Sequence, residues 1–172
     1  MLPKKYIFRI NDSQFSFIIT PKAFHDFLEH NDLETKISHI LGAIHLENKD
    51  STKFAAKAVK DLILRGEFPK NLLSEIMLEY KKFGGILEGT EVHVSLLKDE
   101  APHKVKGDSA LLHKIKEKWS SLFLPHPTFY NPSIVIQVNS PLIKKLKNFR
   151  NLEQKVEKEI GSIIHNSRWV SS

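Results

Sequence analysis

The spacing of hydrophobic residues along the chain changes between two periods, one typical of strands and one typical of helices. Aromatic and β-branched residues fill Lys5–Ile10 and Gln14–Ile19, and the polar Asn-Asp-Ser between them indicates a hairpin. Glu91–Leu97 begins with alternating polar and apolar residues, as a strand does. Ser133–Val138 reads SIVIQV, which predicts a buried strand. The pattern therefore predicts a small number of short strands.

Helical spacing prevails in the rest of the chain. Thr20 and Pro21 favour a helix start, because the threonine hydroxyl can cap free backbone amides and proline suits the first helical turn. Apolar residues then recur three or four positions apart. Each of these apolar stripes predicts a helix: residues 23–28, 33–44, 54–64, 72–80, 109–123 and 140–164. The helix of the fourth stripe is expected to stop at Gly84-Gly85. Because helices outnumber strands, we expect an α+β (α/β-like) fold in which several helices cover a small sheet.

The last predicted helix differs from the others in its charge. Basic residues crowd its first half, where the helix dipole favours acidic side chains: Lys144, Lys145, Lys147 and Arg150. We expect residues 1–139 to form the main unit and residues 140–172 to form an amphipathic helix and tail packed on the same domain. A docked helix is favoured here. The alternative is an exposed basic helix that binds a partner protein, an anionic membrane surface or nucleic acid.

Length and composition narrow the class of protein. A chain of 172 residues is large enough for one domain with a genuine core. It has no cysteine, which excludes a disulfide framework and a thiolate metal site and fits a reducing compartment. No apolar run approaches the length that crosses a bilayer, and the first residues, MLPKKYIFRIND, lack the apolar segment of a signal peptide. We therefore expect a soluble, cytoplasmic protein without a membrane partner.

The net charge favours anionic partners only weakly. The chain has 26 Lys and Arg against 20 Asp and Glu, a formal charge of +6. Such an excess suits nucleotides and nucleic acids. The lysines, however, are spread over nearly every predicted helix, whereas a nucleic-acid interface needs them clustered. A solvated cationic surface is the favoured interpretation, and nucleic acid is a less favoured partner.

Nine histidines raise the question of a metal site. His25 and His30 are five positions apart, and His39 and His45 are six apart. Neither pair shares one helix face, as two histidines four positions apart would. We therefore expect no metal site.

A charged loop follows the strand predicted to end at Leu97. Asp99, Glu100 and His103 could form an acid–base cluster there, but no serine or cysteine nucleophile has a suitable context nearby. A solvated charged loop is the favoured interpretation. Lysines of the same region could nevertheless attract a phosphate: Lys98, Lys104 and Lys106.

Four segments of the chain, in order, carry a family resemblance. They are FSFIITPKAFHDFLEHNDLETKI at 15–37, AVKDLILRGEFPKNLLSEIMLEYKKFGG at 58–85, EVHVS at 91–95 and VKGDSALLHKIKEKWSSLF at 105–123. Together they resemble the N-terminal ATP-binding domain of the phosphoenolpyruvate synthase and pyruvate phosphate dikinase family over residues 13–140. No single segment is specific, but four in the same order are much stronger. The helix predicted from Ser140 has no counterpart in the resemblance.

The resemblance implies a nucleotide-binding fold and a phosphoryl-transfer activity. In that family the domain resembles an ATP-grasp fold, in which two subdomains hold Mg-ATP between them. The phosphoryl group passes to a histidine on a separate swivelling domain, which carries it to pyruvate on a barrel domain. Such chemistry needs cations on the phosphates and acidic residues that hold magnesium. The present chain would correspond to the first ATP-grasp subdomain.

The chain departs from the family pattern where phosphate is handled. The family's Gly-rich, lysine-containing segment has no counterpart, and Ser16 stands for the glycine of its Pro-x-Gly-Phe turn. Ser95 stands where the family's Val-Arg-Ser-Ser-Ala motif has arginine, and Leu96 and Leu97 replace two serines. Only KDEAPHK separates Leu97 from Val105, so the family's Ser-Phe-Ala-Gly-Gln hairpin is deleted. A serine cannot supply the bidentate charge of arginine, and leucine offers no hydrogen bond.

These departures predict a truncated relative that is noncatalytic as an isolated chain, with no catalytic residue assigned. ATP and Mg²⁺ binding would be weak or lost, and any residual nucleotide or phosphate would lie near Ser95, Lys98, Lys104 and Lys106. Two alternatives remain open. The chain could be the ATP-binding subunit of a split phosphotransferase acting on pyruvate, with the missing half on another chain. It could instead be a basic interaction module that binds nucleic acid or an acidic protein through the C-terminal helix.

Overall fold

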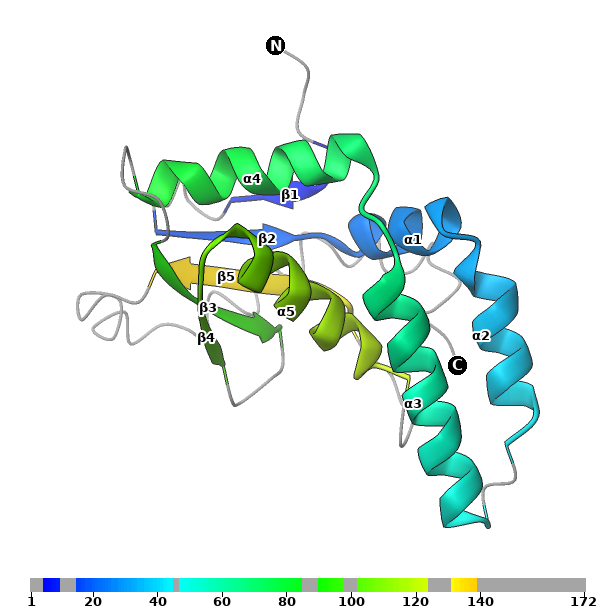
Figure 1. Ribbon diagram of the computed structural model, residues 1–172. Coiled ribbons are helices and arrows are strands. Elements are labelled where there is room, and N and C mark those ends of the chain that lie inside the picture. Colours follow the sequence, from blue (N-terminus) through cyan, green and yellow to red (C-terminus); the bar gives the residue numbers. More distant parts are fainter. Residues whose placement is uncertain are drawn as a thin grey trace.

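The computed structural model describes residues 5–9, 15–44, 47–84, 90–97, 102–123 and 131–138. These residues form an α+β fold, as the sequence predicts, with one five-stranded antiparallel sheet and five helices (Figure 1). The strands are β1 (Ile7–Phe8), β2 (Ser16–Ile19), β3 (Glu91–Leu96), β4 (His103–Lys106) and β5 (Ile134–Val138). The helices are α1 (Pro21–His30), α2 (Leu33–Gly42), α3 (Lys49–Arg65), α4 (Lys70–Gly84) and α5 (Asp108–Ser120).

The strand order in the sheet is β1-β2-β5-β3-β4, so the last described strand lies at the centre. β5 pairs with β2 through Ile134↔Ile19 and with β3 through Ile134↔Leu96. Its apolar residues Ile134, Val135 and Ile136 are all buried. A central strand that is covered on both faces needs this unbroken apolar run, which explains why the segment lacks polar alternation at its start.

One face of the sheet carries the hydrophobic core. Alternate residues of the three inner strands point to this face: Phe17, Ile19, Val92, Val94, Ile134 and Ile136. Buried residues from all five helices join them in a single cluster. In Figure 1, α4 lies along β1 and β2, and α5 crosses in front of β5 and β3. The apolar stripes that predicted the helices are therefore the surfaces that cover the sheet.

Trp119 on α5 lies at the centre of this core. Its ring centroid is 5.3 Å from those of Phe24 and Phe27 and 6.0 Å from that of Phe68. Its indole nitrogen donates a hydrogen bond to the Pro132 carbonyl oxygen at 3.1 Å, so the buried polar atom is satisfied. One residue thus connects α1, the α3–α4 connection and the segment that leads into β5.

The helix boundaries correct two sequence expectations. Thr20 occupies the N-cap position of α1 and Pro21 its first turn, but the threonine side chain makes no capping hydrogen bond, so that part of the prediction is wrong. α3 begins at Lys49, earlier than the apolar stripe indicated. The reason is Asn48, whose side-chain oxygen accepts hydrogen bonds from two backbone amides of the first turn.

The predicted division at residue 139 lies at the edge of the described residues. The basic C-terminal helix predicted over 140–164 lies outside them, so the two-unit organisation stays a prediction. In the ranges that the structure covers, no helix combines the length and apolar character required to cross a bilayer.

Candidate functional site

The β3–β4 hairpin contains three of the four residues predicted to bind phosphate. The strands pair as Glu91↔Lys106, Val92↔Val105, His93↔Lys104 and Val94↔His103. Val92 and Val94 point into the core, so the alternating residues of β3 and their partners point to the opposite face. Ser95, Lys104 and Lys106 therefore share one face of the hairpin. The fourth predicted residue, Lys98, lies outside the described residues.

Ser95 lies deep on this face. It is 7% exposed and pairs with Val135 of β5, which in turn pairs with Ile18 of β2. Val135 and Ile18 are 4% and 2% exposed. The position that the resemblance predicts to match the family's arginine thus holds a small neutral side chain in an apolar row. A hydroxyl can donate one hydrogen bond there, but it supplies no charge.

The two leucines after Ser95 belong to the fold. Leu96 pairs with Ile134 and packs against the core, and Leu97 is 4% exposed. The backbone amide of Leu97 donates to the Ser133 carbonyl oxygen at 3.1 Å, which extends the contact with the β5 segment. Leu96 and Leu97, which the resemblance predicts to replace two serines of the family, therefore serve burial and sheet pairing here.

The charges on the hairpin are exposed. Lys104 and Lys106 are both exposed, and Glu91, which pairs with Lys106, is exposed too. Exposed charges are screened by water and salt, and a carboxylate beside a lysine reduces its attraction for an anion. The hairpin face can attract a phosphate, but among its described residues there is no buried cation that would hold one firmly.

Tyr80 on α4 positions this hairpin. Its hydroxyl donates to the Thr90 carbonyl oxygen at 2.7 Å and accepts a hydrogen bond from the Gly107 amide at 2.9 Å. It thereby connects the start of β3 with the end of β4. Gly107 has φ +99°, a backbone conformation that L side chains rarely adopt, and it is the N-cap of α5. The tyrosine and glycine of the family resemblance therefore have structural roles here.

β4 itself was not predicted from the sequence. Its residues, HKVK, contain one apolar side chain, Val105, and the strand forms the edge of the sheet. Edge strands are short and charged, which leaves little hydrophobic signal. His103 points to the helix-covered face with Val94, away from Lys104. Its predicted neighbours in an acid–base cluster, Asp99 and Glu100, lie outside the described residues.

A cluster in the middle and second half of α1 has the composition of a metal site. Ligand atoms of His25, Asp26 and Glu29 lie within 4.8 Å of one another. Asp26 Oδ2, however, accepts a hydrogen bond from the Tyr6 hydroxyl at 2.8 Å and lies 3.5 Å from Lys22 Nζ. A cation would compete with both donors, so an ion-paired helix surface is favoured. The spacing of histidine pairs does not indicate this cluster, and the absence of a metal site stays a prediction.

Comparison with known proteins gives two matches. Residues 12–96 match the family model described as pyruvate phosphate dikinase, AMP/ATP-binding domain. Over 130 residues the chain is 26% identical to a probable phosphoenolpyruvate synthase of Methanocaldococcus jannaschii, a match that covers 67% of this chain and 11% of that protein. The chain therefore spans about a tenth of the relative's length. Both matches confirm the resemblance predicted from the sequence.

Proposed function

The chain carries an N-terminal ATP-binding domain segment of the phosphoenolpyruvate synthase and pyruvate phosphate dikinase family. We propose that the chain does not transfer phosphoryl groups by itself. Its residual ligand is a nucleotide held weakly on the hairpin face by Lys104 and Lys106, with or without Mg²⁺. In this proposal the chain has the fold of the family's domain but lacks its phosphoryl-transfer activity.

The proposal is supported chiefly by the burial and sheet pairing of residues 95–97. Ser95 is buried in an apolar row, and Leu97 is buried and bonded to the Ser133 backbone. Phosphoryl transfer depends on fixed positive charge at the developing negative charge of the transition state. The strand end that the family equips with arginine and serines here contributes to packing. Function follows from such site residues more than from the fold.

The exposed lysines support weak binding only. An ion pair at the surface contributes about 0–1 kcal/mol, so two lysines without a buried partner correspond to a dissociation constant in the range of about 1 mM or weaker. Magnesium would have to come with the nucleotide, since the family's acidic ligands belong to the second ATP-grasp subdomain. That subdomain has no counterpart among the described residues.

Calorimetric titration with Mg-ATP and with AMP tests the proposal. We expect no saturable binding below about 1 mM, and any weaker signal should fall in the double variant Lys104→Gln/Lys106→Gln. The double variant Lys36→Gln/Lys81→Gln is the matched control, because both lysines are exposed on helices and the charge change is the same. Tight ATP binding that depends on Lys104 and Lys106 would contradict the proposal. It would favour the alternative, an ATP-binding subunit of a split phosphotransferase acting on pyruvate.

A further inference from the structure

The sheet has a second face, opposite to the one that carries the core. Because side chains alternate along a strand, Ile18 of β2, Val135 of β5 and Ser95 of β3 point to this second face. They form one row across the three inner strands, since Val135 pairs with both Ile18 and Ser95. Ile18 and Val135 are buried hydrophobic residues, yet neither belongs to the core cluster under the helices. The row is therefore part of a separate layer.

The second face is buried although it is not the core face. Ile18, Val135 and Ser95 are each at most 7% exposed. Ser133 and Leu97 continue the pairing by one row, through the hydrogen bond from the Leu97 amide to the Ser133 carbonyl oxygen, and both are buried. An antiparallel sheet face that is open to water typically carries exposed polar side chains. A face made of buried residues needs a covering layer.

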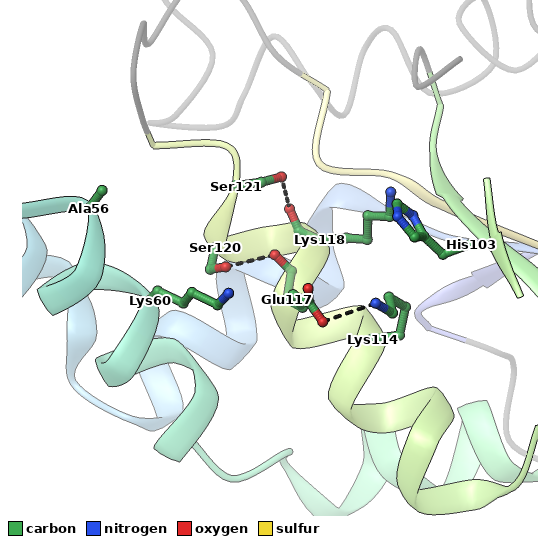
Figure 2. Close-up of a pocket in the computed structure, with 8 residues that line it drawn as sticks. All are labelled: Ala56, Lys60, His103, Lys114, Glu117, Lys118, Ser120 and Ser121. Atoms are coloured by element: carbon green, nitrogen blue, oxygen red, sulfur yellow. Dashed lines mark hydrogen bonds and ion pairs between the residues drawn. The ribbon is translucent and has the colours of Figure 1, made fainter. Parts of the chain in front are cut away.

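The described helices lie on the core side and do not supply this layer. Each of the five contributes buried residues to the core cluster. In Figure 1, α5 crosses in front of β5 and β3. Figure 2 shows Lys118 of α5 extending toward His103 of β4, where both residues line a pocket of about 280 Å³. Because His103 pairs with Val94 and shares its side of the sheet, α5 follows the core side as far as the edge strand.

The segment that follows β5 has the sequence expected of a covering helix. β5 ends at Val138, and residues 140–164 predict an amphipathic helix almost directly after it. A short connection from a strand into a helix usually returns the helix onto the same sheet. The apolar side chains of the segment lie along one stripe: Ile143, Leu146, Phe149, Leu152, Val156, Ile160 and Ile163.

The length of this segment is sufficient for the second face. A helix over residues 140–164 would be about 37 Å long at 1.5 Å per residue. Five strands about 4.8 Å apart are about 24 Å wide, so a single helix can cross all of them. The described helices already occupy the core side, which leaves the second face to the segment. Docking there would remove the apolar stripe from water together with Ile18 and Val135.

We propose that residues 140–164 dock through this apolar stripe on the second face, over Ile18, Val135 and Leu97, and cover the position of Ser95. The burial of the face and the short connection from β5 both support this occupant. Docking selects the packed helix over the exposed basic helix that the sequence left open. Lys104 and Lys106 are exposed on the edge strand, so the weak nucleotide binding proposed above does not depend on the docked segment.

Thiol reactivity tests the docking in the full chain. The chain has no cysteine, so one introduced cysteine reports the access of a reagent to its position. Ser95→Cys reports the second face, Ala23→Cys reports the core under the helices, and Thr35→Cys is the exposed reference. Ser95→Cys should react with dithionitrobenzoate about a hundredfold more slowly than Thr35→Cys, because its thiol is reached only when the covering segment opens.

A charge placed in the apolar stripe should release the segment. Phe149→Asp should speed the reaction of Ser95→Cys about tenfold, because a docked aspartate loses its solvation. The reaction of Ala23→Cys should stay unchanged, which separates undocking from loss of the whole fold. Gln154→Asp is the matched control: it adds the same charge outside the stripe and should leave Ser95→Cys slow.

Four results would overturn the proposal. Ser95→Cys that reacts as fast as Thr35→Cys would mean that the face is open. Slow reaction of Ser95→Cys in Phe149→Asp would assign the cover to another segment. Protection that increases with protein concentration would assign it to a second copy of the chain. Equal acceleration of Ala23→Cys would show that Phe149 supports the whole fold and not this face.

A spin label keeps the test independent of the Phe149→Asp variant. A nitroxide on Gln154→Cys should broaden the methyl signals of Ile18 and Val135 more than that of Ile115, which lies in the core on α5. The broadening should disappear when labelled chains are mixed with isotope-enriched unlabelled chains, because docking is within one chain. Stronger broadening at Ile115, or broadening in the mixed sample, would contradict the proposal.

Discussion

The two faces of the sheet differ in the kinds of residue that they carry. The face under the helices holds the hydrophobic core. Residues from the segments that carry the family resemblance belong to this core, and Trp119 lies at its centre. The hairpin face carries Ser95, Lys104 and Lys106, which the family resemblance predicts to lie at or beside phosphate-handling positions. Because the first face depends on packing and the second on a few charged side chains, a fold can persist after its chemistry is lost.

Trp119→Ala should have the largest effect, because it empties the centre of the core. Removal of a fully buried tryptophan costs about 3–5 kcal/mol in the free energy of unfolding, here with three aromatic contacts and one hydrogen bond lost. Urea unfolding followed by circular dichroism measures the change. Phe54→Ala is the control: Phe54 is 77% exposed, so its loss should cost less than about 0.5 kcal/mol. Similar costs for the two variants would contradict the assigned core.

Ser95→Arg asks whether the family's arginine alone restores the site. Position 95 is 7% exposed beside Val135, so a guanidinium there loses solvation without an assigned partner. We expect a loss of about 2–3 kcal/mol in unfolding free energy and no gain in ATP affinity. Thr35→Arg, at an exposed position of α2, should be close to neutral. A stable Ser95→Arg variant that binds Mg-ATP would show that a single residue separates this chain from a working site.

Tyr80→Phe removes the hydroxyl that connects α4 with both strands of the hairpin. The Gly107 amide loses its acceptor and the Thr90 carbonyl loses a donor. The expected cost is about 1–2 kcal/mol, with faster hydrogen exchange at Gly107. The control is Tyr6→Phe, which removes a different phenol hydroxyl and should leave exchange at Gly107 unchanged. Unchanged exchange at Gly107 in Tyr80→Phe would contradict the role assigned to Tyr80.

Asp26→Asn should have a small, pH-dependent effect. Burial alone would raise the pKa of Asp26, but hydrogen bonds from Tyr6 and His25 outweigh it. Lys22 and Lys5 lower the pKa of this carboxyl further, so the net direction is downward. A lowered folded-state pKa contributes stability above the unfolded pKa of about 3.9, and this contribution is lost as the pH falls through the folded value.

The measurement is chemical unfolding of the wild type and Asp26→Asn at several pH values. Near pH 7 the variant should be less stable by under about 1 kcal/mol, since the pairs are near the surface. The difference should shrink as the pH falls below about 4. A constant difference over that range would contradict the assignment.

Tyr6 should affect stability at the alkaline end. Burial and then Asp26 raise the pKa of Tyr6 to about 12, so the stability that the protonated Tyr6 contributes should fade from about pH 10 upward.

The sequence predicted the helix-covered face well because that face depends on periodicity. Stripes such as Leu111, Ile115 and Trp119 predict a buried helix surface in any arrangement of neighbours. Alternation also predicted a strand over Glu91–Leu97, and β3 covers Glu91–Leu96.

The features that the sequence missed depend on tertiary arrangement. Lys116 of α5 reaches the carbonyl oxygens of Leu64 and Gly66 only because α3 packs on α5, and no local spacing indicates such a contact. β4 carries too little hydrophobic signal at the sheet edge to be predicted. The predicted capping hydrogen bond of Thr20 is absent. The residue type shows only that a hydroxyl can reach a backbone amide, whereas the side-chain conformation decides whether the bond forms.

The rate at which the chain consumes ATP shows whether the hairpin face supports phosphate chemistry. The purified chain would be incubated with Mg-ATP and followed by phosphorus NMR, with Lys104→Gln/Lys106→Gln in parallel. The account predicts that ATP stays intact in both samples, because residues 95–97 serve packing and supply no charge to the phosphates. Consumption of ATP by the wild type that the double variant abolishes would contradict the account, because it would place working phosphate chemistry on the hairpin face.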